Sequence, residues 1–246
     1  MPLYTGDALI LRTYKLGEAD RIVVFLTRDR GKKRGVAKGA RRARSRFLGA
    51  LEPLTEARVA YFEKERRELV GLNFAEPIRS PLVLVGPADR LRQGSGGQEA
   101  GHYVREGQAG HAVRDDHGAL GYVGYFAELL DEWAQEADAD ERLYRLGTSM
   151  LGALSAGTPV EPLARYFEYW LLRLQGVYPE AQGTLSTGAA AFLSASRTIA
   201  PDRVGDLPTG RAVLRELEQL HRGLIVMHLE KTLKSERVLR HMRRDS

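Results

Sequence analysis

The chain contains no cysteine among its 246 residues. Disulfide bonds, thiolate catalysis, iron–sulfur clusters and cysteine-based zinc sites are therefore excluded. Long apolar runs are also missing, because no run exceeds about five residues, and the first residues have neither the charged nor the apolar region of a signal peptide. We therefore expect a cytoplasmic protein with no membrane contact. Its 43% hydrophobic and 28% charged residues are typical of a globular chain of one large or two ordinary domains.

Sequence motifs of several enzyme classes are missing as well. Neither a GxxxxGKS/T phosphate loop nor a GxSxG nucleophile turn occurs. Three histidines, at positions 102, 111 and 117, have spacings that match no metal-binding pattern. Two acidic pairs could serve a metal-dependent nuclease, but helix caps and loop solvation explain them better; they are Asp115 with Asp116 and Asp138 with Asp140. We predict no catalytic residue, no metal and no cofactor.

Positive charge is concentrated in residues 28–46, which read RDRGKKRGVAKGARRARSR. This stretch carries a net charge of +9, whereas the whole chain carries +5, so the remainder is acidic. Such a patch attracts phosphate groups and is typical of a nucleic-acid binder. A solvated charge run is the alternative, but glycine and apolar residues interrupt the run as in a strand that enters a loop. The predicted DNA-binding residues are Lys32, Lys33, Arg34, Lys38, Arg41, Arg42, Arg44 and Arg46.

The first eighty residues show the rhythm of short strands. Five apolar runs, at residues 8–11, 22–26, 35–37, 57–62 and 69–74, alternate with turn residues. Five strands without a helix-length pattern favour a small closed barrel of the OB type, because closure removes exposed strand edges. Such barrels bind oligonucleotides in a basic groove with stacking aromatics. Candidate stacking residues, each also interpretable as a core or rim aromatic, are Tyr14, Phe47, Tyr61 and Phe62.

Several phrases in this region, in order and at matching spacing, resemble the amino-terminal domain of the bacterial RecO recombination mediators. These phrases are LGEADR at 16–21, AKGARR at 37–42, SRF at 45–47 and LEP at 51–53. The resemblance implies an OB barrel that binds single- and double-stranded DNA and anneals complementary strands. It also implies action with RecR on DNA coated by single-strand-binding protein, whose tail would be a partner, so that RecA can load.

The rest of the chain is predicted to be a connector followed by helices. Prolines at 77, 81 and 87 bracket the connector, and the polar, Gly-rich residues 92–118 form a loop that looks like an insertion relative to the family. Apolar residues at period 3.6 predict helices over 118–136, 141–156, 158–176, 189–195, 211–227 and 235–242. The third helix is expected to begin with a capping box of Thr158 and Glu161. We thus predict an α+β chain with an OB domain at 1–80, a connector and insertion at 81–118, and an all-α domain at 119–246.

The helical part also resembles the RecO family, through ELLDE at 128–132, RYFEYWLLRLQGVYPE at 165–180 and LKS at 233–235. Many family members carry a four-cysteine zinc module after the Tyr-Pro pair, but here Pro179 is followed by Leu185 within six residues and no ligand is present. No zinc site can be transferred. A cationic stripe on the last helix, formed by Arg237, Arg240 and Arg244, could bind an acidic peptide tail or DNA, or merely be solvated.

The leading interpretation is a non-enzymatic, nucleoid-associated recombination mediator in DNA repair. An RNA- or ribosome-associated OB protein remains an alternative, because OB grooves accept either nucleic acid. A metal-dependent nuclease is disfavoured by the scattered carboxylates.

Overall fold

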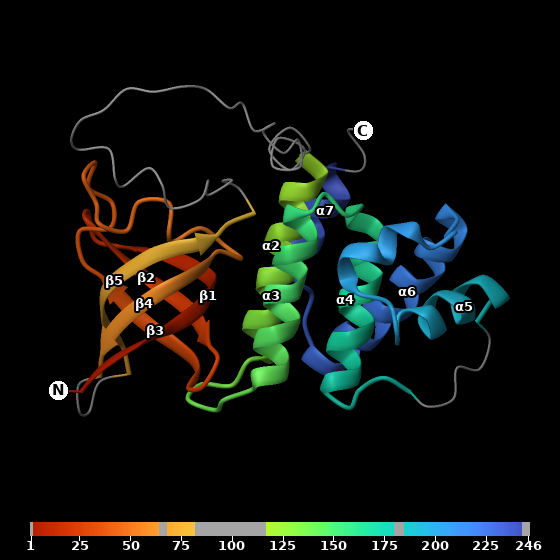
Figure 1. Ribbon diagram of the computed structural model, residues 1–246, viewed down its shortest axis with the longest axis horizontal. Coiled ribbons are helices and arrows are strands. Elements are labelled where there is room, and N and C mark those ends of the chain that lie inside the picture. Colours follow the sequence, from red (N-terminus) through yellow and green to blue (C-terminus); the bar gives the residue numbers. More distant parts are fainter. Residues whose placement is uncertain (1, 64–67, 82–116, 180–184, 243–246) are drawn as a thin grey trace, which may run out of the picture.

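The computed structural model describes residues 2–63, 68–81, 117–179 and 185–242. A β-barrel lies on one side of the molecule and a helical bundle on the other, with helices α2 and α3 between the barrel and the remaining helices (Figure 1). The barrel strands are β1 (Leu3–Leu16), β2 (Asp20–Thr27), β3 (Gly31–Ala37), β4 (Glu56–Phe62) and β5 (Val70–Arg79). The helices are α2 (His117–Trp133), α3 (Glu141–Ser155), α4 (Val160–Leu174), α5 (Thr187–Ala195), the 3₁₀ helix η2 (Pro201–Asp206), α6 (Arg211–Leu229) and α7 (Lys234–Met242).

The five strands close into a barrel in the order β1-β2-β3-β5-β4. All neighbouring pairs are antiparallel except β3 and β5, which pair in parallel through three residues of each strand. The predicted five-stranded OB-type barrel followed by helices is confirmed. The strands are longer than their apolar runs, because pairing continues through polar residues up to the turns.

Apolar side chains of β1 and β2 point to both faces of the sheet. Ala8, Ile10, Val23 and Phe25 fill the barrel interior. Their sequence neighbours, namely Leu9, Leu11, Val24 and Leu26, belong instead to the core that the barrel shares with the helices. Two-sided burial explains why these two runs are continuously apolar, whereas β5 alternates and exposes one face to solvent.

The turn between β2 and β3 lies directly against the segment that joins α2 to α3. Lys32 N–H donates to the carbonyl of Gln135 at 3.0 Å, and Ala137 N–H donates to the carbonyl of Lys32 at 3.2 Å. Gly31 has φ +65°, and a Cβ added there would lie 2.2 Å from the carbonyl oxygen of Asp138. This position therefore requires glycine for both its backbone conformation and its close approach.

One local prediction is wrong. The N-cap of α4 is Pro159, with no side-chain capping bond, because the Thr158 hydroxyl donates to the Asp202 carbonyl of η2 at 3.1 Å. Strand β5 extends beyond its expected apolar run at 69–74 and continues through Pro77 to Arg79. Proline is tolerated there because this end of β5 pairs only with β4, beside a register shift.

Most of the predicted connector and insertion lies outside the described residues, at 82–116, and the last two insertion residues already belong to α2. The proposed division at residues 80 and 118 remains a prediction. Helix η2 was not anticipated, because its six residues are too short to show a period.

Candidate nucleic-acid interface

Apolar anchors hold the loop between β3 and β4 against the barrel. Phe47, Ala50 and Leu51 from this loop are at most 5% exposed and join the interior core of the barrel. Hydrogen bonds also attach the start of the loop to the turn between β1 and β2. Gly39 N–H donates to Asp20 Oδ1 at 2.8 Å, and Arg41 N–H donates to the carbonyl of residue 19 at 2.9 Å. The loop therefore has a defined position on the barrel surface.

Six of the eight predicted DNA-binding residues present exposed cations on this side of the barrel. Among the described residues, none of the six has a carboxylate within ion-pairing distance. Arg41 is held in place by a neutral acceptor, since its Nη1 donates to the carbonyl of Gly17 at 2.9 Å. The uncompensated charge of these six residues is thus available to an anion. The six, called the loop cations below, are Arg34 on β3 together with Lys38, Arg41, Arg42, Arg44 and Arg46 in the loop that follows it.

The other two predicted residues are not brought to this surface. Lys32 Nζ lies 3.3 Å from Asp131 Oδ1 of α2, and the two side chains are 15% and 12% exposed. Lys33 pairs in register with the interior residue Phe25, and its Nζ lies 2.8 Å from Glu63 Oε1. Because successive strand residues point to opposite faces, these adjacent lysines have different partners. Both of them neutralise carboxylates.

Two of the four candidate stacking aromatics are core residues. Phe47 and Tyr61 are each 2% exposed, and burial raises the pKa of Tyr61 to about 12. Phe62 is partly buried, whereas Tyr14 is 42% exposed. Tyr14 pairs with Ile22, which pairs in turn with Val36, so the three residues form an outward row beside the loop. Only Tyr14 therefore combines wide exposure with a position next to the loop cations.

Sequence reasoning missed Leu48, which is 78% exposed within the cationic loop. Its neighbour Phe47 is buried, so the Phe-Leu pair sends one side chain into the core and the other into solvent. No sequence signal distinguished Leu48 from Phe47, because the adjacent Ala50 and Leu51 of the same loop are both buried.

Arg12 links the barrel face to a row of carboxylates on α2. Its guanidinium donates to the Tyr14 hydroxyl at 3.2 Å and lies 3.2 Å from Asp131 and 3.6 Å from Glu128. Burial alone would lower the pKa of Arg12, but the Tyr14 hydrogen bond and the nearby carboxylates outweigh it and raise that pKa. The sequence pattern did not reveal this role, because the carboxylate partners of Arg12 lie more than a hundred residues away in the chain.

Glu128, one of these carboxylates, also holds the start of α7. Glu128 accepts hydrogen bonds from the backbone N–H of Lys234 at 3.1 Å and of Ser235 at 2.7 Å. Burial would raise the pKa of Glu128, but the Ser235 and Lys234 hydrogen bonds and the Arg12 charge lower it. In the predicted cationic stripe Arg237 is exposed, whereas the Arg240 side chain and all of Arg244 lie outside the described residues.

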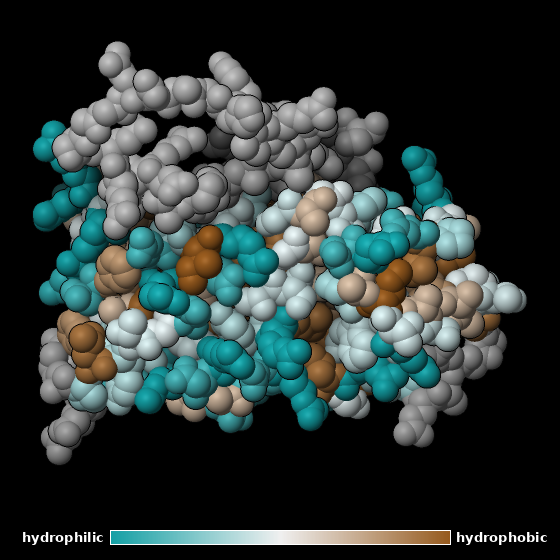
Figure 2. Space-filling view, viewed as in Figure 1, coloured by the Kyte–Doolittle hydropathy of each residue, from teal (hydrophilic) through white to brown (hydrophobic). Residues whose placement is uncertain are grey.

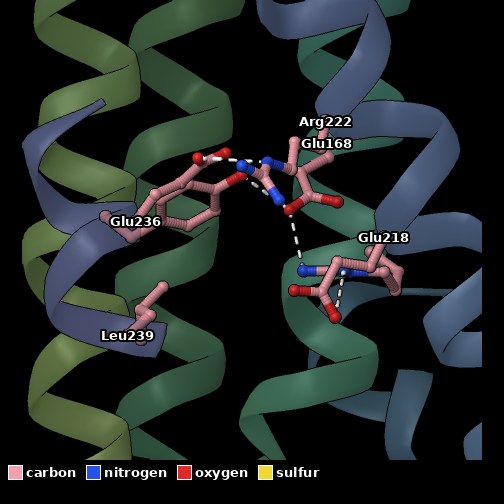
Figure 3. A pocket seen from close by; sticks show the side chains of 7 residues that line it. Glu168, Glu218, Arg222, Glu236 and Leu239 are labelled. Atoms are coloured by element: carbon pink, nitrogen blue, oxygen red, sulfur yellow. Dashed lines mark hydrogen bonds and ion pairs between the residues drawn. The ribbon is translucent and has the colours of Figure 1, made fainter. Parts of the chain in front are cut away.

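A small cavity lies among α2, α4, α6 and α7 (Figure 3). Its volume is about 30 Å³, close to that of a single water molecule. Glu168 beside it accepts hydrogen bonds from Tyr125 at 2.8 Å and Arg165 at 2.8 Å, and lies 3.0 Å from His221. The cavity is therefore a small polar packing defect, and its size does not suit a substrate.

Of the four acidic residues considered for a nuclease site, Asp140 has a structural role instead. Asp140 is the N-cap of α3 and accepts a hydrogen bond from the Leu143 N–H at 2.9 Å. Within the described ranges, no group of three His, Asp or Glu side chains is arranged to hold a metal ion. Asp115 and Asp116 lie outside those ranges. In the same ranges, no helix is long and apolar enough to cross a membrane.

Polar and apolar side chains are intermixed on the face shown in Figure 2. Hydrophilic residues cover much of the barrel side, and apolar residues appear there as separate spots (Figure 2). A barrel surface of this kind suits a polar ligand better than a large apolar partner.

Comparisons with known proteins match both halves of the chain. Residues 1–81 match the family "Recombination protein O N terminal", and residues 114–196 match "Recombination protein O C terminal". A protein named "DNA repair protein RecO" from Koribacter versatilis is 33% identical over 178 residues, which cover 72% of this chain and 61% of that protein. Its namesake from Anaeromyxobacter sp. (strain K) is 33% identical over 181 residues, covering 74% and 60%. A further namesake, from Geobacter metallireducens, is 29% identical over 269 residues, covering 97% and 98%. The chain thus spans about three fifths of the first two relatives and nearly all of the third.

Proposed function

Because this chain belongs to the RecO family of DNA repair proteins, we propose that it is a recombination mediator that binds single- and double-stranded DNA and anneals complementary strands. The observation that carries the proposal is the set of six loop cations on β3 and the anchored loop after it, without carboxylate partners among the described residues. Phosphate contacts of this kind supply affinity and not sequence preference. Tyr14 adds an exposed ring on which a base can stack.

The proposal includes the partners that the family resemblance implies. We propose that the protein acts with RecR on DNA coated by single-strand-binding protein, contacts the acidic tail of that protein, and so assists RecA loading. It acts by binding and not by bond cleavage. Work on chromosomal DNA also implies that the protein is found at the nucleoid.

Salt dependence of DNA affinity tests the proposal. If the six loop cations contact phosphates, the log–log slope of affinity against salt on a single strand is about −4. Replacing four of them with alanine flattens the slope by up to about 3 units and weakens every sequence alike. The four replaced residues are Arg41, Arg42, Arg44 and Arg46.

A matched control removes the same charge from exposed arginines of the helical part. These are Arg142 and Arg145 on α3 with Arg211 and Arg215 on α6, all changed to alanine. The control is expected to retain most of the parent slope, and circular dichroism verifies that both variants fold. An unchanged slope in the folded loop variant would place the DNA site elsewhere.

Annealing and competition assays distinguish a mediator from the alternatives. The parent is expected to accelerate pairing of complementary labelled oligonucleotides without cleaving them in Mg²⁺, and the loop variant is expected to lose this acceleration. Competition by RNA that exceeds competition by DNA would favour an RNA-binding role instead. Binding of the acidic tail peptide distinguishes a mediator from a generic DNA binder.

A further inference from the structure

Two exposed arginines, one on α4 and one in the turn after α5, converge on one phenol oxygen in the helical part. The Tyr169 side chain of α4 is buried, with 0% exposure. Its oxygen accepts hydrogen bonds from Arg173 Nη1 at 3.0 Å and from Arg197 Nε at 3.0 Å. Arg173 belongs to α4, whereas Arg197 follows the end of α5. The pairing of Tyr169 with Arg197 could not be read from the chain, because 28 positions separate them.

The cluster contains hydrogen-bond donors without an acceptor. In the part of the chain that the structure describes, neither arginine has a carboxylate within ion-pairing distance. Two incoming hydrogen bonds occupy the lone pairs of the phenol oxygen, and its own hydrogen has no acceptor among the described residues. Two exposed positive charges therefore gather at one point of the surface, held from below by a buried phenol.

Neighbouring contacts hold this cluster in place. The Arg173 guanidinium carbon lies 5.6 Å from the centre of the Tyr169 ring and 6.0 Å from that of Trp170. The Trp170 indole N–H donates to the carbonyl of Ser196 at 3.0 Å and thereby joins α4 to the turn that carries Arg197. The two guanidinium groups are therefore positioned in advance, which lowers the cost of binding a ligand.

An oxyanion is the ligand that this arrangement suits. Two guanidinium groups bound to one oxygen repel each other. An anion placed between them attracts both groups and so offsets this repulsion. Guanidinium groups bind phosphate through paired, charge-assisted hydrogen bonds. We propose that Arg173 and Arg197, positioned by the buried Tyr169 hydroxyl, form a phosphate-binding site for the backbone of a second nucleic-acid strand.

Aromatic rings beside the cations favour a nucleic-acid strand over an acidic peptide. Trp170 and Tyr178 are both partly exposed, and the Tyr178 ring centre lies 5.0 Å from that of Tyr169. Cations next to stacking rings are the usual composition of a single-strand site. Helices α4 and α5 lie beyond α2 and α3 as seen from the barrel (Figure 1), so a strand bound here is separate from one on the loop cations. This inference rests on the proposed function, because annealing requires that two strands be held together.

The test compares Arg173→Gln/Arg197→Gln with the control Arg142→Gln/Arg145→Gln, which removes equal charge from exposed positions of α3. In the background of the four loop substitutions, loss of two phosphate contacts is expected to flatten the residual salt slope on single strands by about 1.4 units. In the otherwise unchanged protein, the annealing rate is expected to fall about tenfold, because the second strand loses those two contacts, while affinity for a first strand changes less than about twofold. Tyr169→Phe retains the ring and is expected to give a smaller loss in the same direction.

The possible outcomes separate this inference from the proposed function. A parent protein that binds no DNA would refute the proposed function. A parent that anneals, together with a double variant that behaves like its control, would overturn the inference alone.

Inorganic phosphate and an acidic peptide are the two further probes. A thermal shift with phosphate that the double variant loses, without any change in oligonucleotide binding, would indicate a small-anion site and overturn the strand assignment. Loss of peptide binding alone would overturn it in favour of a carboxylate site.

Discussion

Lys32→Met is expected to lower the stability of the protein without changing its DNA affinity. Lys32 lies in the most cationic stretch of the chain, but its ammonium group donates to the backbone carbonyl of Asp131 and lies 3.3 Å from that residue's carboxylate. Hydrogen bonds to charged groups contribute about 1.5–3 kcal/mol each. Methionine keeps most of the packing of the aliphatic stem, and Asp131 retains Arg12 at 3.2 Å.

A loss of about 2 kcal/mol corresponds to a decrease in Tm of about 4–8 °C for a chain of this size. The single-strand salt slope is expected to stay constant, because Lys32 is already neutralised. The opposite pattern is expected for the exposed pair Arg42→Met/Arg44→Met. There the slope flattens by about 1.4 units and Tm changes little, since surface substitutions usually stay within about 0.5 kcal/mol.

Thermal unfolding and fluorescence anisotropy over a salt series measure both quantities on the same samples. The reasoning would be refuted if Lys32→Met flattened the slope and left Tm unchanged. In that case Asp131 would not hold Lys32 in solution, and the division between structural lysines and loop cations would be wrong.

Three further predictions concern stability. The lowered pKa of Glu128 stabilises the fold at pH values above about 4.3, the unfolded value. The unfolding free energy is therefore expected to decrease as pH falls below about 5, and to decrease less in Glu128→Gln, as denaturant titrations at several pH values would show. Tyr61→Phe is expected to leave stability unchanged or raise it by up to about 1 kcal/mol, because the buried Tyr61 hydroxyl has no hydrogen-bond partner among the described residues. A measured loss of stability would reveal a partner such as a bound water. Gly31→Ala is expected to cost at least about 2 kcal/mol, since the new Cβ would meet the Asp138 backbone at a positive φ, and an unchanged Tm would contradict that contact.

Local patterns were sufficient for the order and type of the strands and α-helices, though not for the 3₁₀ helix η2. Apolar runs between turn residues indicated five strands, and a 3.6-residue period indicated six helices, because each pattern depends only on which positions must be buried along one element. The concentration of charge in residues 28–46 and the phrases of the RecO family are likewise properties of the chain itself. Pairing through polar residues, as in β5 beyond Pro77, extended past these patterns.

Only the tertiary structure decided what each charged side chain does. Lys32 and Lys33 are adjacent in the chain, but the strand directs one to α2 and the other to Glu63. Lys32 and Asp131 are 99 positions apart, so no local pattern could pair them. Arg173 and Arg197 converge for the same reason, because two helices meet at Tyr169. Burial and charge compensation depend on whichever distant element packs against a residue, and that packing exists only in the folded chain.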